Sequence, residues 1–323
     1  MTTATAPFVS LFGLDPATYR PHTLHDETRT YPETDCYTDI IIELLHARGD
    51  EPLAVLGPTV RLDLEGDQWT FFKPDPRALE QFFGVDIHEM QPYRPLPAQI
   101  AELIGAGHTM TVELDAWHMP DTASTSYRAE HVKTSIIPES IDPERELLRY
   151  FHNASYHELD GADFRGIFRL DGADPAILPP YAEIVRFDAG PRLSGADLRR
   201  AAFAELRHHL ERIPRTNPFG RFGARLGTDL PRLLEGDAAA YHAYAFATVR
   251  MAGAGFELCS AHVDWLLGAA GAPAVAAFTR IVEGSKVLNF RLARRRAFDP
   301  TPIIDDLGAA WDEAMSSLRR AVG

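Results

Sequence analysis

Patterns typical of β-strands occur only in the first part of this chain and stop at about Gly195. From Gly195 onward, apolar residues recur at helical spacing in four stretches that Pro or Gly separates. A chain organised in this way predicts an α+β domain followed by an all-α helical bundle. The β-rich runs cover residues 109–117, 132–140, 147–153 and 182–188, with turn signals such as Asp142-Pro143 between them.

The charge distribution also divides the chain in two. Residues 1–189 contain 14 Lys and Arg against 32 Asp and Glu, whereas residues 190–323 contain 18 against 14. We therefore expect an α+β domain over 1–189 and a helical domain over 190–323. The net charge of −14 argues against a nucleic-acid partner, because phosphates require clustered Lys and Arg.

Several familiar chemistries lack their sequence motifs. The chain has no G-x-x-x-x-G-K-[ST], G-x-G-x-x-G, G-x-S-x-G, H-E-x-x-H or C-x-x-C pattern. The N-terminal residues do not resemble a secretory signal, and the longest apolar stretch, 266–278, is too short to span a bilayer. Two cysteines cannot form a disulfide framework. We therefore expect a cytoplasmic protein with no membrane partner.

One cysteine occupies a position suited to a nucleophile. Thr34 and Asp35 are plausible N-caps of a helix that places Ile40, Ile41, Leu44 and Leu45 on one face and ends at Gly49. Cys36 would open this helix, where the helix dipole favours the thiolate. Nearby carboxylates act in the opposite direction, so activation requires a specific cationic partner such as a histidine. The second cysteine, Cys259, lies among apolar residues in mid-helix and is expected to be a core residue.

A histidine and an asparagine flank a predicted hairpin. His131 begins the run HVKTSIIPES, a turn follows at IDPE, and the second run ends at Asn153. In such a hairpin the first residue of one strand and the last of the next lie side by side, so Asn153 would hold the His131 ring towards Cys36. Cysteine, histidine and asparagine then follow in papain-like chain order.

Four segments carry a resemblance to a known family. PETDCYTD, GDQWTFFKP, DAWHMPDTASTSYRAEHVKT and YFHNASYHEL resemble a bacterial family described as a domain of unknown function, over nearly the whole chain. That family is distantly similar to the papain-like acyltransferase of the butirosin pathway, and its genes accompany amino acid:carrier-protein ligases. The resemblance implies a papain-like domain that takes an acyl or aminoacyl group from a carrier-protein thioester and passes it to an amine or other small-molecule acceptor.

The resemblance assigns roles to individual residues. Cys36 would accept the acyl group, His131 would be the general base and Asn153 would orient the histidine. Papain-like enzymes often use a Gln about six residues before the Cys for the oxyanion hole, and Thr30 stands there in this chain. The Cys36 N–H together with Gln68 or Trp69 would serve instead. The remaining candidates for the acyl or amine pocket are Trp117 and Tyr127.

The predicted partner is a carrier protein that brings its own phosphopantetheine, so no cofactor bound to this chain is expected. Carrier proteins present acidic helices, and a basic cluster near the end of the third predicted C-terminal helix would dock them. The cluster contains Lys286, Arg291, Arg294, Arg295 and Arg296.

Three alternatives to acyl transfer remain open from the residues. Water in place of an amine would make the protein a cysteine hydrolase, that is an amidase, peptidase or thioesterase. Loss of the chemistry would leave a carrier-binding scaffold. A metal site is the third, although the candidate ligands lack convincing spacing and none is expected. Those ligands are Asp115, His118, Asp121, His131, His152 and His157.

Overall fold

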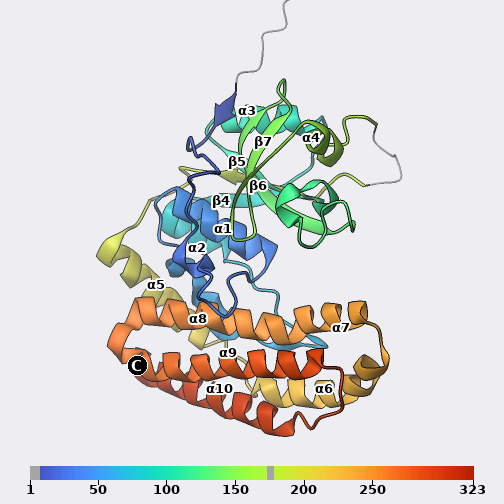
Figure 1. Ribbon diagram of the computed structural model, residues 1–323. Coiled ribbons are helices and arrows are strands. Elements are labelled where there is room, and N and C mark those ends of the chain that lie inside the picture. The colour runs from blue at the N-terminus through green and yellow to red at the C-terminus, as the bar shows by residue number, and fades with distance from the viewer. Residues whose placement is uncertain (1–7, 173–177) are drawn as a thin grey trace, which may run out of the picture. The chain divides into compact units, whose positions relative to one another are not determined.

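The computed structural model describes residues 8–172 and 178–323, which form two compact units (Figure 1). The first unit combines the described residues up to 25 with residues 35–51 and the described part of 75–193. The second combines residues 26–34, 52–74 and 194–323. The chain is α+β, with an antiparallel sheet in its N-terminal region and helices in its C-terminal region, as predicted. No helix of the described residues is long and apolar enough to cross a membrane.

The first unit contains a seven-stranded antiparallel sheet in the order β4-β9-β5-β6-β7-β8, with β1 paired to β6. The four predicted runs form β5, β6, β7 and β9, so this part of the prediction is confirmed. Each run supplies apolar side chains to at least one face of the sheet. The strands are β1 Val9–Ser10, β4 Asp86–Met90, β5 Thr109–Asp115, β6 Lys133–Asp142, β7 Leu147–His152, β8 Ser155–Asp160 and β9 Ala182–Arg186.

Helices α3 and α4 pack on one face of this sheet. Val112 and Leu114 of β5 share a core with Ile100 of α3 and Phe164 of α4, and all four side chains are buried. Short helices complete the unit between these elements. The helical elements of the unit are η1 Thr23–His25, α1 Cys36–Ala47, α2 Pro76–Phe83, α3 Leu96–Gly105, η3 Ala116–His118, η4 Pro120–Thr122 and α4 Gly161–Ile167.

Helix α1 packs against strands β6, β7 and β8. Asp35 caps it, since its carboxylate accepts the backbone N–H groups of Tyr37 and Thr38 at 3.1 and 2.9 Å. The nine residues 37–45 are all buried. The helix ends at Ala47, and Gly49 follows in the left-handed region with φ of +74°. The predicted N-cap and stop are therefore confirmed, and Cys36 is the first residue of the helix.

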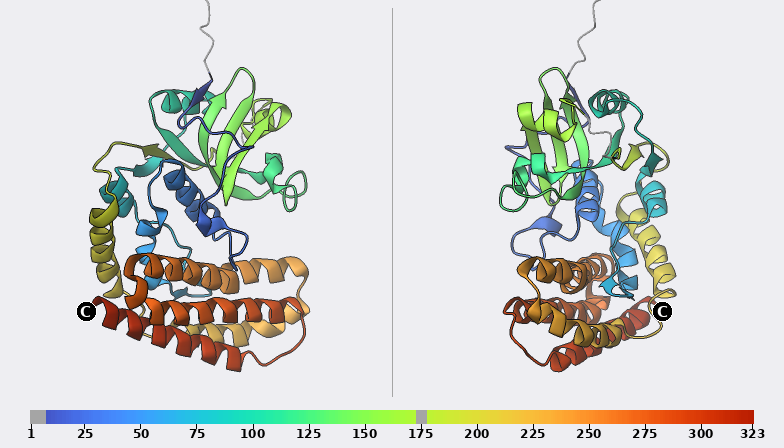
Figure 2. Two further views of the ribbon diagram at one scale, coloured as in Figure 1. Left: turned by 60° about the vertical axis from the view of Figure 1, so that its left-hand side comes forward. Right: turned by 90° about the vertical axis from the view of Figure 1, so that its right-hand side faces the viewer.

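The second unit is built mainly from helices, with α6, α8, α9 and α10 running alongside one another (Figure 2). Helix α7 continues through the π-helical turn η5 into α8. The elements are η2 Pro52–Arg61, β2 Leu64–Glu65, β3 Gln68–Trp69, α5 Gly195–Leu210, α6 Pro218–Glu235, α7 Ala238–Ala245, η5 Phe246–Arg250, α8 Met251–Leu267, η6 Gly268–Ala270, α9 Ala272–Ala293 and α10 Thr301–Val322.

Helix α6 was not among the four predicted helices. Its sequence contains three glycines and Pro231, which resemble loop signals. The structure explains Gly223, because a Cβ there would lie 2.7 Å from a side-chain carbon of Ile304 in α10. The close packing of α6 on α10 therefore requires glycine at position 223. Glycine is also the residue type that made α6 hard to recognise from the sequence.

The compact units of the structure differ from the predicted division at residue 189 in two segments. Residues 26–34 and 52–74 belong with the C-terminal helices, although they precede most of the sheet in the chain. Element η2 packs on α5 and α8, and its Val55, Leu56 and Val60 are buried. These contacts join residues that are far apart in sequence, so local patterns do not reveal them.

Two glycines of the first unit allow a test of this packing. Gly84 caps α2 with φ of +63°, and a Cβ there would lie 2.7 Å from the Gly190 carbonyl oxygen. Gly107 has φ of +82°, with nothing within 4 Å of the same position. We expect Gly107→Ala to lower the free energy of unfolding by about 1 kcal/mol and Gly84→Ala by about 2–4 kcal/mol, since only Gly84 adds a clash with backbone. Urea denaturation measures both, and equal losses would contradict the close approach.

Candidate active site

Cys36 is half-buried, whereas residues 37–45, which follow it in α1, are buried. As the first residue of α1, it lies at the positive end of the helix dipole. The adjacent Tyr37 side chain hydrogen-bonds to Glu183 of β9. The start of α1 therefore lies near strand β9, and Cys36 is the half-buried residue at that start.

The His131 ring is hydrogen-bonded to the Asp115 carboxylate. Its Nδ1 lies 2.7 Å from Oδ2 of Asp115, the last residue of β5. The Trp117 ring stacks on the imidazole at 4.6 Å between centroids and an interplanar angle of 13°. The His131 side chain is 72% exposed, so the imidazole is accessible from solvent. A carboxylate and an indole thus fix the orientation of an exposed histidine.

The alternation of side chains along β5 assigns this pair to the same face of the sheet as α1. Thr111 donates to Glu183 at 2.9 Å, and Glu183 also bonds Tyr37, so Thr111 points towards α1. Asp115 lies four residues after Thr111 in a strand of regular register and therefore points the same way. Cys36 and the His131–Asp115 pair consequently belong to one face. No hydrogen bond joins the thiol to the imidazole in the part of the chain that the structure describes.

A shallow depression of about 300 Å³ lies beside His131. Asp115 and His131 form part of its wall together with Lys133, Arg169 and Tyr181. The hydroxyl of Tyr181 donates to Glu183 at 3.0 Å. The same carboxylate therefore connects this depression with Tyr37, the residue next to Cys36.

Asn153 does not orient His131, so this prediction is corrected. β6 begins at Lys133, two residues after the histidine, and its register pairs Ile137 with Phe151. Asn153 then extends β7 towards Ser135 and has φ of +47° in the turn before β8. The left-handed turn explains the asparagine, which tolerates this conformation.

Four of the six candidate metal ligands form two histidine–carboxylate pairs, which lie on opposite faces of the sheet. His152 Nδ1 lies 2.5 Å from Asp121 Oδ2, and its Nε2 lies 2.8 Å from the Thr134 hydroxyl. Tyr150, which shares the core with α3 and α4, donates to the same Asp121 carboxylate. This second histidine–carboxylate pair therefore faces away from α1. Among the described residues no group of three such side chains is placed to hold a metal ion.

Two of the four predicted pocket residues belong to the second unit. Trp69 is 1% exposed and packs against Phe219, Phe222 and Phe256 at 4.8 to 5.9 Å between centroids. Trp69 is a core residue, and its assignment to the oxyanion hole or pocket is corrected. Gln68 is exposed beside it in β3.

The other two pocket candidates lie in the loop between β5 and β6. Trp117 contacts His131, as described above. The Tyr127 hydroxyl donates to Asp163 of α4 at 2.9 Å, and Arg128 pairs with the same carboxylate. Tyr127 thus anchors the loop to α4, while Trp117 is the aromatic residue beside the imidazole. Cys259 is fully buried, and burial raises the pKa of its thiol to about 12, in keeping with the predicted core role.

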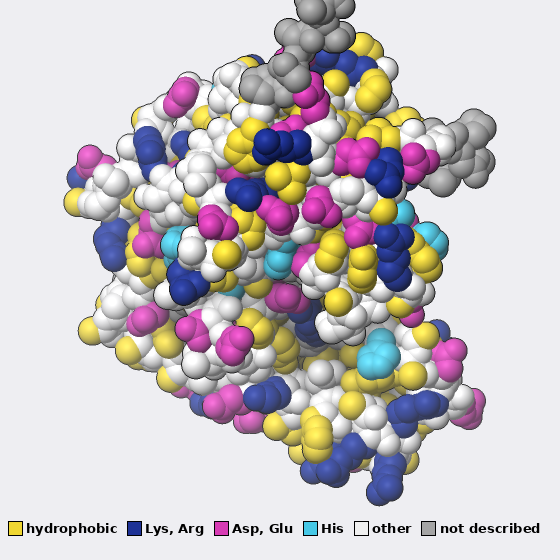
Figure 3. Space-filling view, turned by 45° about the horizontal axis from the view of Figure 1, so that its top comes forward, with side chains coloured by type: hydrophobic (Ala, Val, Ile, Leu, Met, Phe, Trp, Pro, Cys, Tyr) yellow, Lys and Arg dark blue, Asp and Glu magenta, His cyan; other side chains and the backbone are white. Residues whose placement is uncertain are grey.

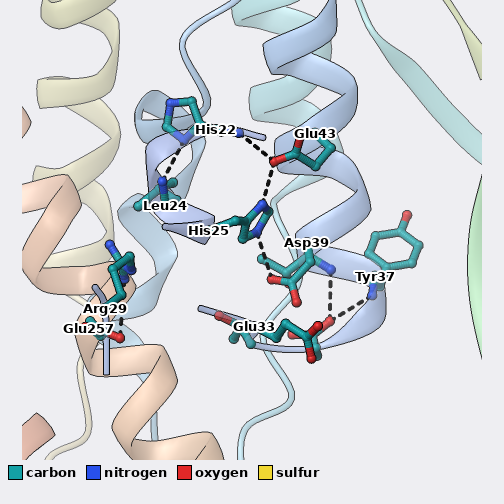
Figure 4. A network of polar contacts seen from close by, with 12 residues as sticks. His22, Leu24, His25, Arg29, Glu33, Tyr37, Asp39, Glu43 and Glu257 are labelled. Carbon is teal, nitrogen blue, oxygen red and sulfur yellow. Dashed lines mark hydrogen bonds and ion pairs between the residues drawn. The ribbon is translucent and has the colours of Figure 1, made fainter. Parts of the chain in front are cut away.

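The sequence did not predict a buried ionic network on α1, in the turns that follow Cys36 (Figure 4). His25 lies between Asp39 and Glu43, with its ring nitrogens 3.4 and 2.5 Å from their oxygens, and all three side chains are at most 2% exposed. Tyr19 donates to the same Glu43. The i, i+4 spacing of Asp35, Asp39 and Glu43 is the signal that would have revealed one charged face on α1.

The network shifts the protonation of its members. Burial lowers the pKa of His25, but bonds to Asp39 and Glu43 outweigh burial and raise this pKa to about 9. Burial, together with the negative charge of Asp39, raises the pKa of Asp35 to about 7. His25 is therefore the cation that neutralises carboxylates on α1 at neutral pH.

The basic residues predicted for docking differ in their contacts. Lys286 and Arg291 are exposed on α9, and Arg294 stacks over Phe290 at 4.4 Å. Arg295 has φ of +50° and donates to the Gly236 carbonyl, so it closes a turn. Arg296 is exposed beyond the helix. On the face drawn in Figure 3, acidic and basic side chains are interspersed.

The fold and this arrangement define a two-part protein, an α+β unit with a helix-borne cysteine and a helical unit. The sequence matches the DUF1839 N-terminal domain over residues 20–187 and the DUF1839 C-terminal domain over residues 195–320. The chain therefore belongs to the DUF1839 family. A comparison with curated proteins gave no match.

The His25 network predicts a loss of stability at alkaline pH. The His25 pKa is about 9 in the folded protein against 6.5 ordinarily, so its contribution is complete below pH 6.5 and disappears as pH rises through 9. We expect the free energy of unfolding to fall by about 2–3 kcal/mol between pH 7 and 9.5. Asp35 titrates mainly below this window. Urea denaturation of His25→Gln should lack this fall, whereas His242→Gln, at an exposed position, should retain it.

Proposed function

We propose that this protein is a cysteine-dependent acyltransferase with a papain-like first unit. It would take an acyl or aminoacyl group from the phosphopantetheine thioester of a carrier protein and transfer it to an amine or another small acceptor. The observation that carries this proposal is a half-exposed cysteine at the start of a buried helix, on the sheet face that also presents the His131–Asp115 pair.

In this proposal Asp115 takes the role first expected of Asn153. In the neutral ring, a hydrogen bond from Nδ1–H of His131 to the Asp115 carboxylate keeps the ring proton on Nδ1. Nε2 then carries a free lone pair and is the atom that removes the proton from the Cys36 thiol. Asp115 also stabilises the imidazolium that forms. Catalytic hydrogen bonds are often long in the absence of substrate and shorten in its complex, which accommodates the absence of a thiol–imidazole bond here.

The proposed reaction has two steps. The Cys36 thiolate attacks the thioester carbonyl, the bond from carbon to the carrier sulfur breaks, and that sulfur takes the proton from His131. The acceptor amine then attacks the acyl-Cys36 carbonyl while His131 removes its proton, and the Cys36 thiolate leaves. The sum is thioester plus amine giving amide plus thiol. The backbone N–H of Cys36 is the proposed donor to the oxyanion.

Covalent capture of the acyl group tests the proposal. We expect the wild-type protein, mixed with aminoacyl-loaded carrier proteins, to gain the mass of one acyl group on Cys36. Cys36→Ser should gain no stable thioester, and Cys259→Ser should behave like the wild type because Cys259 is fully buried. Intact-protein and peptide mass spectrometry measure the adduct. Absence of an adduct across the panel, with Cys36 alkylating at the rate of an ordinary thiol, would refute the nucleophile. Release to added amines, as opposed to water, distinguishes transfer from hydrolysis.

A second set of variants separates Asp115 from Asn153. We expect His131→Ala to lower the acylation rate at least about 100-fold and Asp115→Asn about 10- to 100-fold. Asn153→Gly should change the rate less than about 3-fold, since glycine keeps the left-handed turn. Single-turnover acylation measures all three. If the Asn153→Gly variant were acylated slowly and the Asp115→Asn variant at the wild-type rate, Asn153 would be the residue that orients His131.

A further inference from the structure

The loop between β5 and β6 carries Trp117 near its start and His131 near its end. The two ends of the loop are joined, because the Ala116 N–H donates to the Val132 carbonyl at 2.9 Å. Asp115 accepts the Trp117 N–H at 3.1 Å through Oδ1 and bonds the His131 ring through Oδ2. The orientation of the imidazole therefore depends on how this loop is held.

Asp121 anchors the loop on the opposite face of the sheet. It lies in η4, four residues after Trp117, and its carboxylate accepts the Tyr150 hydroxyl and lies 2.5 Å from Nδ1 of His152. Burial raises the pKa of Asp121, but the bonds to His152 and Tyr150 outweigh burial and lower this pKa. The carboxylate is therefore ionised and can only accept, so Nδ1 of His152 carries a proton.

His152 also bonds the strand that follows the loop. Its Nε2 lies 2.8 Å from the hydroxyl of Thr134 in β6, three residues after His131. Both residues of this bond are buried, so the loss of either partner would leave a buried polar atom without a hydrogen bond. One enclosed ring thus joins Asp121 to Thr134, and these two residues flank His131 in the chain.

The same three side chains could be interpreted as a hydrolytic triad. Thr134 would be the nucleophile, His152 the base and Asp121 the orienting carboxylate. A nucleophile must meet its substrate, but Thr134 is 6% exposed and His152 only 2%. The enclosure of these groups favours a bond that holds segments of the chain together.

We propose that His152 is a positioning residue for His131. Its bonds to Asp121 and Thr134 fix the chain on both sides of His131 and so hold the Trp117 ring against the imidazole. A displacement of about 1 Å at a reacting group can lower a rate about 100-fold, so an anchor that does not touch the substrate still affects the reaction. The effect on acyl transfer rests on the proposed function, whereas the effect on the His131 ring does not.

Variants of Thr134 test this anchor in the full chain. His152→Ala is unsuitable, because it would leave the buried Asp121 carboxylate without its partner and destabilise the unit. Thr134→Val removes only the hydroxyl that bonds Nε2, and Thr134→Ser restores a hydroxyl. Thr109→Val is the matched control, since it removes another buried hydroxyl of the same sheet, which donates to the Pro138 carbonyl. Thermal unfolding checks that each variant is folded.

NMR of isotope-labelled histidine reports the His131 ring, whose signal is assigned with His131→Gln. We expect this signal to move in Thr134→Val towards that of a free histidine, because the ring protons leave the Trp117 indole. The wild type, Thr134→Ser and Thr109→Val should share one signal position.

Single-turnover acylation by an aminoacyl-loaded carrier protein measures the effect on the reaction. The rate at saturating donor should fall about 10-fold in Thr134→Val and less than about 2-fold in Thr134→Ser and Thr109→Val. The donor concentration that gives half of the maximal rate should change less than about 2-fold in all three, because the anchor does not touch the donor.

The outcomes separate positioning from chemistry. An unchanged His131 signal in Thr134→Val, or an equal shift in Thr109→Val, would overturn the inference. A shift specific to Thr134→Val with acylation at the wild-type rate would also overturn it, since His131 would then need no such anchor. If the shift is specific and the wild type itself is never acylated, His152 does position the ring and the proposed function is refuted.

Discussion

The burial of α1 depends on the pairing of its carboxylates with a single cationic histidine. A buried carboxylate without a partner is strongly unfavourable, and α1 carries Asp35, Asp39 and Glu43 on adjacent turns of one face. His25 lies against two of them, and the third is an N-cap whose pKa rises to about 7. The segment before α1 is thereby bound to the helix, and the start of α1, with Cys36, is held against the sheet.

Strand alternation then determines which histidine lies on the sheet face that α1 covers. Two histidine–carboxylate pairs lie on the same sheet, and both have geometry suited to orienting an imidazole. His131 and Asp115 point to the face of α1, whereas His152 and Asp121 point to the face of α3 and α4. Successive side chains in a strand point to opposite faces of the sheet. A shift of the strand register by one residue would therefore exchange the faces of the two histidines. The loop between β5 and β6 supplies both Trp117 and the anchoring residue Tyr127.

Much of the fold was predictable because its signals are local. The cap at Asp35, the stop at Gly49 and the β-rich runs depend on residues within a few positions of one another. The site was predictable only in part. Cys36 and His131 have recognisable positions, but the hairpin argument misplaced Asn153, since β6 begins after His131 and β7 turns sharply at Asn153. Trp69 was misassigned because the three phenylalanines that bury its ring are far away in the sequence, so a short motif does not reveal them.

The sequence by itself determined the change from β-rich runs to helices, the change from an acidic α+β region to a more basic helical region, and the helix that Cys36 begins. These properties follow from composition, periodicity and capping, which are local. The tertiary structure decided that residues 26–34 and 52–74 join the helical unit, that Asp115 pairs with His131, and that Val287 and Phe290 remain exposed on α9. Each of these depends on contacts between distant residues, where the free energy of burial and ion pairing outweighs local preference.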